Sequence, residues 1–345
     1  MHLIIDIRST SPIDPIITRY AGSWVDLWVS HHPTDTISYI HYVHQDCPEN
    51  GRSVIVTPPY WWWGSQKLSK GDTSEIFRCV NFSPYPPYDP TIDTISHIWD
   101  HTDILYPHHT RGLWYRLLWT NANTRNSTKN TIIVPSLSIG QEAVEITHAN
   151  ESSIEIIPYI ALTPGKWDRH TLSQLSISGP YWLYDGSYGS ESGIIQLLSG
   201  YRDYRELWGM HILLLIGQQS SVETRYIALQ IQSLGLTGSV RIIGALDYTS
   251  LESIYIHASG WIYVGAYYSG GPRIELARSH HIPLLISDIP ALLDYRDDAM
   301  TIHPSHLASL GQMLRDLETS EQKETRKISN DNIMIGYGRV IARKR

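Results

Sequence analysis

Short apolar runs alternate with segments of helical spacing in both halves of the chain, and this alternation constrains the fold more than any other feature. Leu3–Ile7 is typical of a buried strand, and Tyr20, Trp24 and Trp28 recur on one side of the segment Ile17–Val29 that follows it. Strands that alternate with helices form mostly parallel sheets with helices on both faces. The sequence therefore predicts an α/β protein with two doubly wound, Rossmann-like domains.

The same two patterns predict the other elements of each half. In the first half we expect strands at Ile37–Val43, Ser53–Thr57, Ile95–Trp99, Thr131–Val134 and Ile154–Pro158, and a loop-rich stretch over Pro58–Pro90. In the second half we expect strands at Tyr181–Tyr184, His211–Ile216, Ser239–Ile243, Trp261–Val264 and Ile282–Ser287, and helices at Gly193–Arg205, Glu223–Leu234, Ser250–Ala258 and Ser305–Leu317. The stretch Ala161–Gly179 carries Pro, Gly and Ser and is predicted to link the two halves.

Length, charge and cysteine content limit the class of protein. A chain of 345 residues is long enough for two domains, and its net charge of -7 argues against a nucleic-acid partner. Cys47 and Cys79 have no metal-site spacing and indicate a reducing, cytoplasmic compartment. We expect no membrane span or signal peptide, because there is no apolar run of about 18 residues and no basic leader. The basic tail Arg343–Arg345 is either a solvated end or a peripheral contact with the inner face of a membrane.

The segment Val264–Ala277 combines an expected strand end, a glycine turn and a helix. Gly270 and Gly271 let the backbone approach a ligand closely, and Pro272 suits the first helical position. The free N–H groups of such a helix favour an anion, and Glu275, one turn further on, could accept hydrogen bonds from sugar hydroxyls. The unit is interpreted either as a nucleotide-sugar pocket or as an ordinary tight turn.

Histidine pairs invite a metal interpretation that their spacing does not support. The adjacent pairs at residues 31–32, 108–109 and 280–281 point apart on a strand or a helix. His97 and His101 would converge on a metal only in a helix, whereas a strand is expected there. We therefore expect no metal site and no cofactor.

Two further groups keep both a functional and a structural interpretation. Asp100, His101 and Asp103 could form an acid–base group at a strand end, or serve as a cap or turn. Trp61–Trp63 could be a platform for an acceptor or a membrane, or could pack onto its own domain.

The ordered series of segments resembles the GT-B glycosyltransferases, specifically the large retaining family 4 (glycosyl transferases group 1). The resemblance spans nearly the whole chain and is strongest over residues 181–294. Its segments are IDIRSTSPIDPIITRYAGSW, IWDHTDILYP, WLYDGSYGSESGI, ILLLIGQ, LGLTGSVRIIGALDYTSLESIYIHA and YYSGGPRIELARSHHIPLLISDIPAL, none of them specific alone.

The resemblance implies a GT-B architecture of two Rossmann-like domains that face a central cleft. Residues 1–165 would bind the acceptor and residues 166–325 the nucleotide sugar, and a C-terminal helix at 329–342 would cross back onto the first domain. The implied reaction moves a sugar from a nucleotide diphospho-sugar to a glycan, lipid or other acceptor, in polysaccharide or glycoconjugate assembly. The rival hypothesis is a catalytically degenerate, glycosyltransferase-like binding or scaffold protein.

Several motif positions depart from the family pattern. Glu275 takes the place of the second glutamate of the family's E-x7-E segment, which holds the donor ribose, but Tyr267 replaces the first, near the donor sugar. Ser187 and Ser192 replace the basic pair on the diphosphate, although Gly186 and Gly193 are retained around them. In the first half, Ile16 replaces a loop glycine and Trp99 replaces a histidine, while Arg19, Tyr20, Asp100 and the following His101 are present.

The missing basic pair matters physically, because cations normally stabilise the leaving diphosphate in the transition state. Arg273 is the nearest candidate cation in the sequence. An arginine in the first turn of a helix opposes the helix dipole, so we expect it to be mildly unfavourable unless an anion lies nearby. Arg273 is therefore interpreted either as a ligand of a bound diphosphate, which would supply that anion, or as an ordinary solvated helix residue.

Overall fold

The computed structural model describes residues 1–7, 15–42, 52–56, 77–82, 93–106, 130–217, 221–268, 270–319 and 329–342. The chain divides into two compact units, one of residues 1–160 with 328–345 and the other of residues 161–327. The segments around Trp61–Trp63, His108–His109 and Arg343–Arg345, and Cys47, lie outside the described residues.

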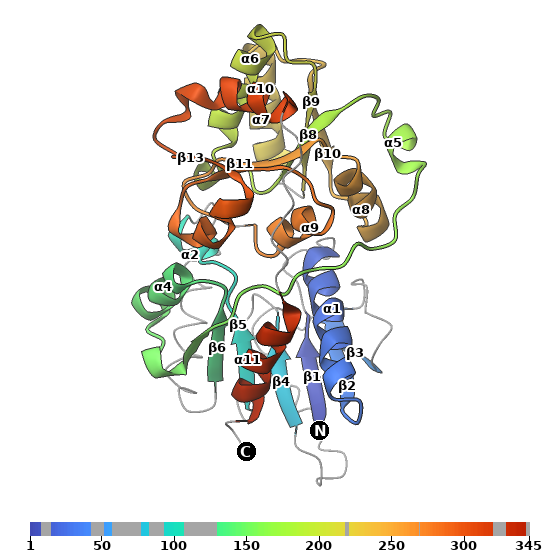
Figure 1. The fold of residues 1–345 in the computed structure, drawn as a ribbon, viewed down its shortest axis with the longest axis vertical. Coiled ribbons are helices and arrows are strands. Elements are labelled where there is room, and N and C mark those ends of the chain that lie inside the picture. Colours follow the sequence, from blue (N-terminus) through green and yellow to red (C-terminus); the bar gives the residue numbers. More distant parts are fainter. Residues whose placement is uncertain are drawn as a thin grey trace. The chain divides into compact units, whose positions relative to one another are not determined.

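The first unit is a parallel sheet in which the described strands follow the order β3-β2-β1-β4-β5-β6-β7 (Figure 1). Its strands are β1 His2–Asp6, β2 Thr36–Tyr42, β3 Arg52–Val56, β4 Phe77–Asn81, β5 Thr94–His97, β6 Asn130–Val134 and β7 Ile154–Ile156. Its described helices are α1 Pro15–His31, α2 Thr102–Leu105, α4 Leu137–Thr147, the short 3-10 helix η1 Glu151–Ser153, and α11 Asn330–Ala342. The order reverses direction beside β1, as in doubly wound sheets.

The second unit repeats this plan with the strand order β10-β9-β8-β11-β12-β13, again all parallel. Its strands are β8 Tyr181–Asp185, β9 Ile212–Ile216, β10 Val240–Gly244, β11 Gly260–Tyr263, β12 Leu284–Ser287 and β13 Met300–Ile302. Its helices are α5 Thr171–Gln174, η2 Ser190–Ser192, α6 Ile194–Glu206, α7 Ser221–Ser233, α8 Tyr248–Ile256, α9 Arg273–Ser279, η3 Pro290–Asp298, η4 Leu307–Ser309 and α10 Leu310–Thr319. The predicted α/β class with two doubly wound sheets is confirmed.

The central strands of both sheets are buried on both faces, which explains their continuous apolar sequences. In β9 the run Leu213–Ile216 is almost completely inaccessible to solvent, and in β1 Leu3–Ile5 is equally buried. The expected helix over residues 17–29 is α1, whose Tyr20, Trp24 and Trp28 lie in the core as their spacing predicted.

One expectation was wrong: the stretch Pro58–Pro90 is not only loop. Phe77–Asn81 forms β4, which pairs with β1 on one side and β5 on the other. Arg78 is the second residue of this strand and is nevertheless buried. Because a charged residue in a short run masks a buried strand, the pattern of apolar residues alone did not reveal β4.

The C-terminal helix α11 packs against the first unit beside α1 (Figure 1). Tyr337 of α11 meets the ring of Trp24 of α1 edge to face, with the ring centroids 5.3 Å apart. Its phenol hydroxyl lies 2.7 Å from Nε2 of His97 on β5. The first unit is therefore built from two stretches of chain that are far apart in sequence.

Candidate functional site

The second unit has its topological switch point between β8 and β11, which are neighbours in the sheet although two strands separate them in the chain. In doubly wound sheets, ligands bind outside the carboxyl ends of the strands at such a point. The segments that leave these two ends are residues 186–193 after β8 and residues 264–272 after β11. We call this place the β8–β11 edge.

The two segments of the β8–β11 edge touch through their backbones. The carbonyl of Glu191 accepts a hydrogen bond of 2.9 Å from the N–H of Ala266. A Cβ at Gly193 would lie 2.6 Å from the carbonyl oxygen of Val264, and a Cβ at Gly265 would lie 2.6 Å from that of Glu191. Gly193 also has a φ of 68°, in the left-handed region. These glycines are therefore required by close backbone approach.

The hydroxyls of Ser187 and Ser192 are engaged within their own loop. Ser187 donates to Oε1 of Glu191 at 2.7 Å, and Ser192 donates to the carbonyl of Gly189 at 2.6 Å. Ser192 is fully buried and also accepts a hydrogen bond from the N–H of Ile194. At Gly186, just after β8, a Cβ would lie 2.8 Å from the hydroxyl of Tyr184. The loop therefore places a buried carboxylate, that of Glu191, beside the two serines.

Arg273 forms an ion pair with Asp185, the last residue of β8. Nε of Arg273 lies 3.0 Å from Oδ1 of Asp185, and Nη1 donates to the carbonyl of Gly270 at 3.2 Å. The second oxygen of Asp185 accepts a hydrogen bond of 2.7 Å from the hydroxyl of Tyr255. The anion that the sequence led us to expect from a ligand is thus supplied by the protein itself.

The glycine turn before α9 is held by Tyr268. The hydroxyl of Tyr268 donates to the carbonyl of Gly271 at 2.9 Å, and Gly271 has a φ of 53°. A Cβ at Gly270 would meet the ring of Tyr268 at 2.6 Å. Pro272 occupies the N-cap position, just before α9. We had expected it to be the first residue of the helix. The ring of Tyr268 thus leaves no room for a side chain at residue 270.

Glu275 lies in α9 and is buried in an ion pair. Both of its oxygens accept hydrogen bonds from Nη1 of Arg278, at 3.1 and 3.2 Å, and Nη2 of Arg278 continues to Asp298 at 2.8 Å. Burial raises the pKa of the Glu275 carboxyl to about 6, although the charge of Arg278 opposes the shift. Its predicted ribose contact therefore requires this pair to rearrange.

Tyr267, at the position expected near a donor sugar, is buried and bonds through its backbone. Its carbonyl accepts a hydrogen bond from the hydroxyl of Tyr263, and its N–H points to the carbonyl of Glu191 at 3.4 Å. A phenol cannot replace the charge of a carboxylate at neutral pH. The β8–β11 edge consequently has Asp185 and Glu191 as its carboxylates and Arg273 as its cation.

In the first unit, Asp100 and His101 follow β5 and form a small polar cluster with α4. Nδ1 of His101 lies 3.1 Å from Oε2 of Glu142, and Oδ1 of Asp100 accepts from the N–H of Thr102 at 2.8 Å. Burial raises the pKa of the Asp100 carboxyl, and the hydrogen bond from the N–H of Thr102 opposes this. Asp100 therefore accepts the first N–H of α2, whose N-cap residue is His101, and has a raised pKa.

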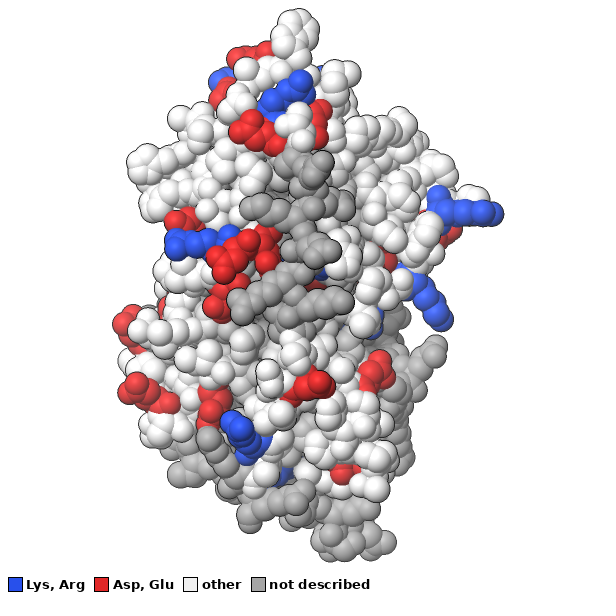
Figure 2. All heavy atoms as spheres, in the orientation of Figure 1, with Lys and Arg blue, Asp and Glu red and all other residues white. Residues whose placement is uncertain are grey.

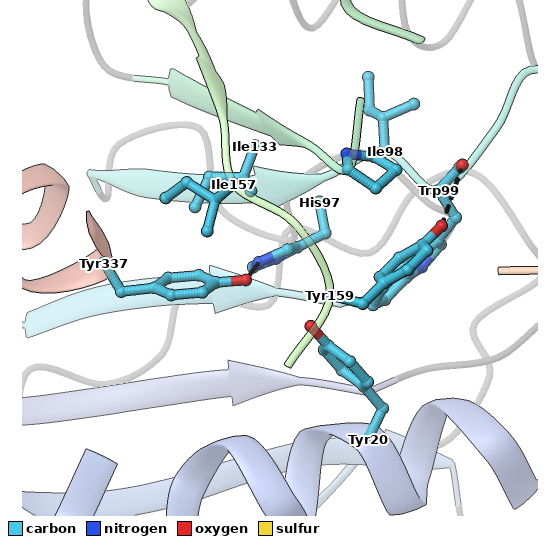
Figure 3. A pocket seen from close by; sticks show the side chains of 9 residues that line it. Tyr20, His97, Ile98, Trp99, Ile133, Ile157, Tyr159 and Tyr337 are labelled. Carbon is cyan, nitrogen blue, oxygen red and sulfur yellow. Dashed lines mark hydrogen bonds between the residues drawn. The ribbon is translucent and has the colours of Figure 1, made fainter. Parts of the chain in front are cut away.

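A small pocket opens at the carboxyl ends of β5, β6 and β7 (Figure 3). The space open to the centre of a water molecule is about 10 Å³, which is room for about one water. Trp99 and Tyr159 stack on one side of it, and His97 and Tyr337 meet across it. The indole of Trp99 donates to the carbonyl of Phe82, so Trp99 is held by the core.

Arg19, the other acceptor-side residue expected from the sequence, lies on α1. It donates to the hydroxyl of Ser23 at 2.8 Å.

The structure reveals polar partners that the sequence did not single out: Asp185, Glu191 and Glu142. Asp185 and Glu142 meet partners that are far away in the chain, whereas Glu191 meets Ser187 within the same loop. Of the three, only Asp185 leaves a signal in the sequence, because it is an acidic residue at the end of an otherwise apolar strand.

The described residues contain neither a metal-binding cluster nor a membrane-spanning helix. Among the described residues, no three His, Cys, Asp or Glu side chains gather closely enough to hold a metal ion. Within the described ranges, no helix combines the length and apolar character needed to cross a bilayer. On the face drawn in Figure 2, the described Lys and Arg side chains are scattered among acidic and uncharged ones and form no basic patch.

Comparison with solved structures identifies the architecture. The chain superposes on WaaG, a glycosyltransferase involved in lipopolysaccharide biosynthesis, with a TM-score of 0.64 and 12% identity over 92% of this chain and 90% of that one. The sucrose-phosphate synthase of Thermosynechococcus elongatus gives a TM-score of 0.67 at 12% identity and covers 99% of both chains. The chain has the GT-B fold.

A third GT-B structure is Anabaena HepE in complex with UDP and glucose, with a TM-score of 0.65 at 11% identity over 94% of this chain and 91% of that one. Neither a protein-family model nor a curated protein matches the sequence. The GT-B architecture expected from the sequence is therefore confirmed by structure, at identities that show the fold alone.

Proposed function

We propose that this GT-B protein is a glycosyltransferase that moves a sugar from a nucleotide diphospho-sugar to a glycan, lipid or other acceptor. The observation that carries the proposal is the GT-B fold over nearly the whole chain, which matches HepE, a protein crystallised with UDP and glucose. The retaining outcome and the place in polysaccharide or glycoconjugate assembly rest on the resemblance of the sequence motifs.

In this proposal the second unit binds the donor at the β8–β11 edge. The proposed donor-binding residues after β8 are Gly186, Ser187 and Ser192. Those after β11 are Gly270, Gly271, Arg273 and Glu275. Tyr267 belongs to the segment after β11, and its N–H points to the carbonyl of Glu191 in the other segment. The site needs no cofactor or metal beyond the nucleotide sugar itself.

The first unit would supply the acceptor side and proton transfer. A carboxyl with a raised pKa suits a general acid, and a histidine held by a carboxylate suits a general base. We assign these roles to Asp100 and to His101, which Glu142 orients. Arg19 and Trp99 are the proposed acceptor-side residues. We place the protein in the cytoplasm, with its acceptor reached at the inner face of the membrane where that acceptor is a lipid.

A second candidate function is a catalytically degenerate, glycosyltransferase-like subunit that binds a partner or a glycan. The ion pair between Arg273 and Asp185 favours it, because the cation of the β8–β11 edge is already neutralised. Two serine hydroxyls occupy the places of the family's basic pair, and hydroxyls stabilise a leaving diphosphate less than cations do.

Calorimetric titration with UDP, UDP-glucose and a panel of other nucleotide sugars, followed by a donor-hydrolysis assay, tests the proposal. A ligand at 100 times its Kd should raise the free energy of unfolding by about 2.7 kcal/mol. If His101 is the base, His101→Gln should lower turnover on the order of 10²–10⁴-fold.

His211→Gln is the matched control, because His211 is also bonded to a glutamate, Glu318 at 2.9 Å, but lies at the amino end of β9. Binding without turnover across the panel would favour the degenerate subunit. The absence of any nucleotide binding by the folded protein would overturn the donor role altogether.

A further inference from the structure

The ion pair at the β8–β11 edge is unequal in its access to solvent. The Arg273 side chain is 19% exposed, whereas the Asp185 side chain is 3% exposed. Tyr255, itself fully buried, holds the far oxygen of the carboxylate. A ligand that arrives at this edge therefore meets the guanidinium, with a fixed negative charge directly behind it.

Glu191 adds a second negative charge to the same edge. It is 1% exposed, accepts from Ser187, and belongs to the loop whose backbone contacts the segment after β11. Within residues 185–193 and 263–275, Arg273 is the one basic side chain in the sequence. A buried carboxylate that cannot reorient or be hydrated strongly opposes the binding of a nearby anion.

We propose that Asp185 is an internal counter-ion of the donor site, which lowers its affinity for nucleotide diphosphates and does so more for the free diphosphate than for the nucleotide sugar. The inference rests on the proposed donor site. Its physical basis is charge: the terminal phosphate of a free nucleoside diphosphate ionises further, whereas in a nucleotide sugar that oxygen is esterified. The penalty from Asp185 is consequently larger for the product than for the donor, which favours product release.

The isosteric change Asp185→Asn removes the charge and keeps an oxygen for Arg273. We expect UDP to bind to this variant at least about tenfold more tightly than to the wild type. The gain should be smaller for UDP-glucose and absent for uridine, and it should shrink as salt is added. Inorganic pyrophosphate should show the gain without any base. Tyr255→Phe is the matched control, because it removes the hydrogen bond from the Tyr255 hydroxyl to Asp185 and leaves the charge of the carboxylate.

Arg273→Gln provides an independent arm that does not alter Asp185. It leaves the buried carboxylate without its cation, so affinity for UDP should fall by a larger factor than affinity for UDP-glucose. Titration calorimetry on full-length wild type and variants, each checked by circular dichroism, gives these ratios directly. The inference holds if the two variants move the ratio of UDP to UDP-glucose affinity in opposite directions.

The outcomes separate this inference from the proposed function. If the wild type binds UDP-glucose and turns it over, but neither variant changes the affinity ratio, Asp185 is not a counter-ion of the donor site and the proposed function stands. If UDP or pyrophosphate binds only to Asp185→Asn, the inference holds and the wild-type protein is not a donor-binding enzyme. If neither the wild type nor any variant binds either anion, both ideas are overturned.

Discussion

The expected contribution of Arg273 to stability changes sign once its partner in the structure is known. From sequence alone it is a cation at the start of a helix, which the helix dipole disfavours by a few tenths to about 1 kcal/mol. In the structure it neutralises the buried carboxylate of Asp185 at 3.0 Å. Removing Arg273 would leave Asp185 as an unpaired buried charge. The free energy lost in this way is larger than the free energy gained by removing the unfavourable interaction with the helix dipole. The sign of its contribution to stability is therefore opposite to the sequence-based expectation.

We expect Arg273→Ala to lower the free energy of unfolding of the second unit by about 1.5–3 kcal/mol, the range for hydrogen bonds to charged groups. Adding Asp185→Asn should recover part of the loss, because the stranded charge is then removed. Arg202→Ala is the matched control: its partner Asp203 is 41% exposed, so the loss should stay below about 1 kcal/mol. Urea unfolding of the three variants measures this. Equal losses for Arg273→Ala and Arg202→Ala would contradict the assignment.

At the scale of elements, α11 is attached to the first unit by polar as well as apolar contacts. Nη1 of Arg78, in the buried strand β4, donates to the carbonyl of Ile341 in the last turn of α11. The arginine donates to a carbonyl in the last described turn and complements the negative end of the helix dipole. One turn earlier, Tyr337 reaches His97. The burial of Arg78 in β4, unexplained by the strand alone, is accounted for by α11.

The Tyr337–His97 contact gives a prediction for how firmly α11 is held. Nδ1 of His97 faces the carbonyl of Asn81, so Nε2 accepts from the Tyr337 hydroxyl at 2.7 Å. Tyr337→Phe should therefore leave a buried acceptor unsatisfied and cost about 1–3 kcal/mol. Ile335→Ala, on the exposed side of α11, should cost less than about 0.5 kcal/mol. Hydrogen exchange in α11 provides the readout, and equal protection in both variants would argue against the role of this bond.

At the scale of the whole molecule, each unit carries a buried titratable group, and burial shifts the pKa values of the two groups in opposite directions. In the first unit, burial lowers the pKa of His97 from 6.5 to about 3. In the second unit, burial raises the pKa of Glu275 from 4.5 to about 6. Because the chain divides into two compact units, a single free energy of unfolding does not describe it. Each unit should therefore be followed separately.

The contributions of these two groups to stability should change in opposite directions with pH. Between pH 6.5 and 3 the unfolded chain protonates His97 and the folded unit does not, so the His97 contribution falls as pH falls, by up to about 1.4 kcal/mol per pH unit. Between pH 4.5 and 6 the folded state keeps the Glu275 proton that the unfolded chain has lost, so that contribution falls as pH rises.

Hydrogen exchange of each unit from pH 4.5 to 7, in the wild type, His97→Gln and Glu275→Gln, measures the two slopes. Each variant should flatten the slope of its own unit, relative to wild type, and leave the other unit unchanged. If the stability of the first unit still falls with falling pH in His97→Gln, a group other than His97 is responsible. Asp100 would not explain such a slope, because burial raises the pKa of its carboxyl and so gives a slope of the opposite sign.

The sequence by itself determined the class and order of the elements, because helix and strand periods, glycine turns and proline positions act over a few residues. It placed α1 through Tyr20, Trp24 and Trp28, and its ordered motifs were enough to expect the GT-B fold. It missed β4, whose buried Arg78 has its partner in α11. It also missed the internal anion of Arg273, because Asp185 is 88 residues away in the chain. Only the strand order of the sheet, which sets β8 beside β11, brings these two charges together, and a pairing decided by topology leaves no local trace in the sequence.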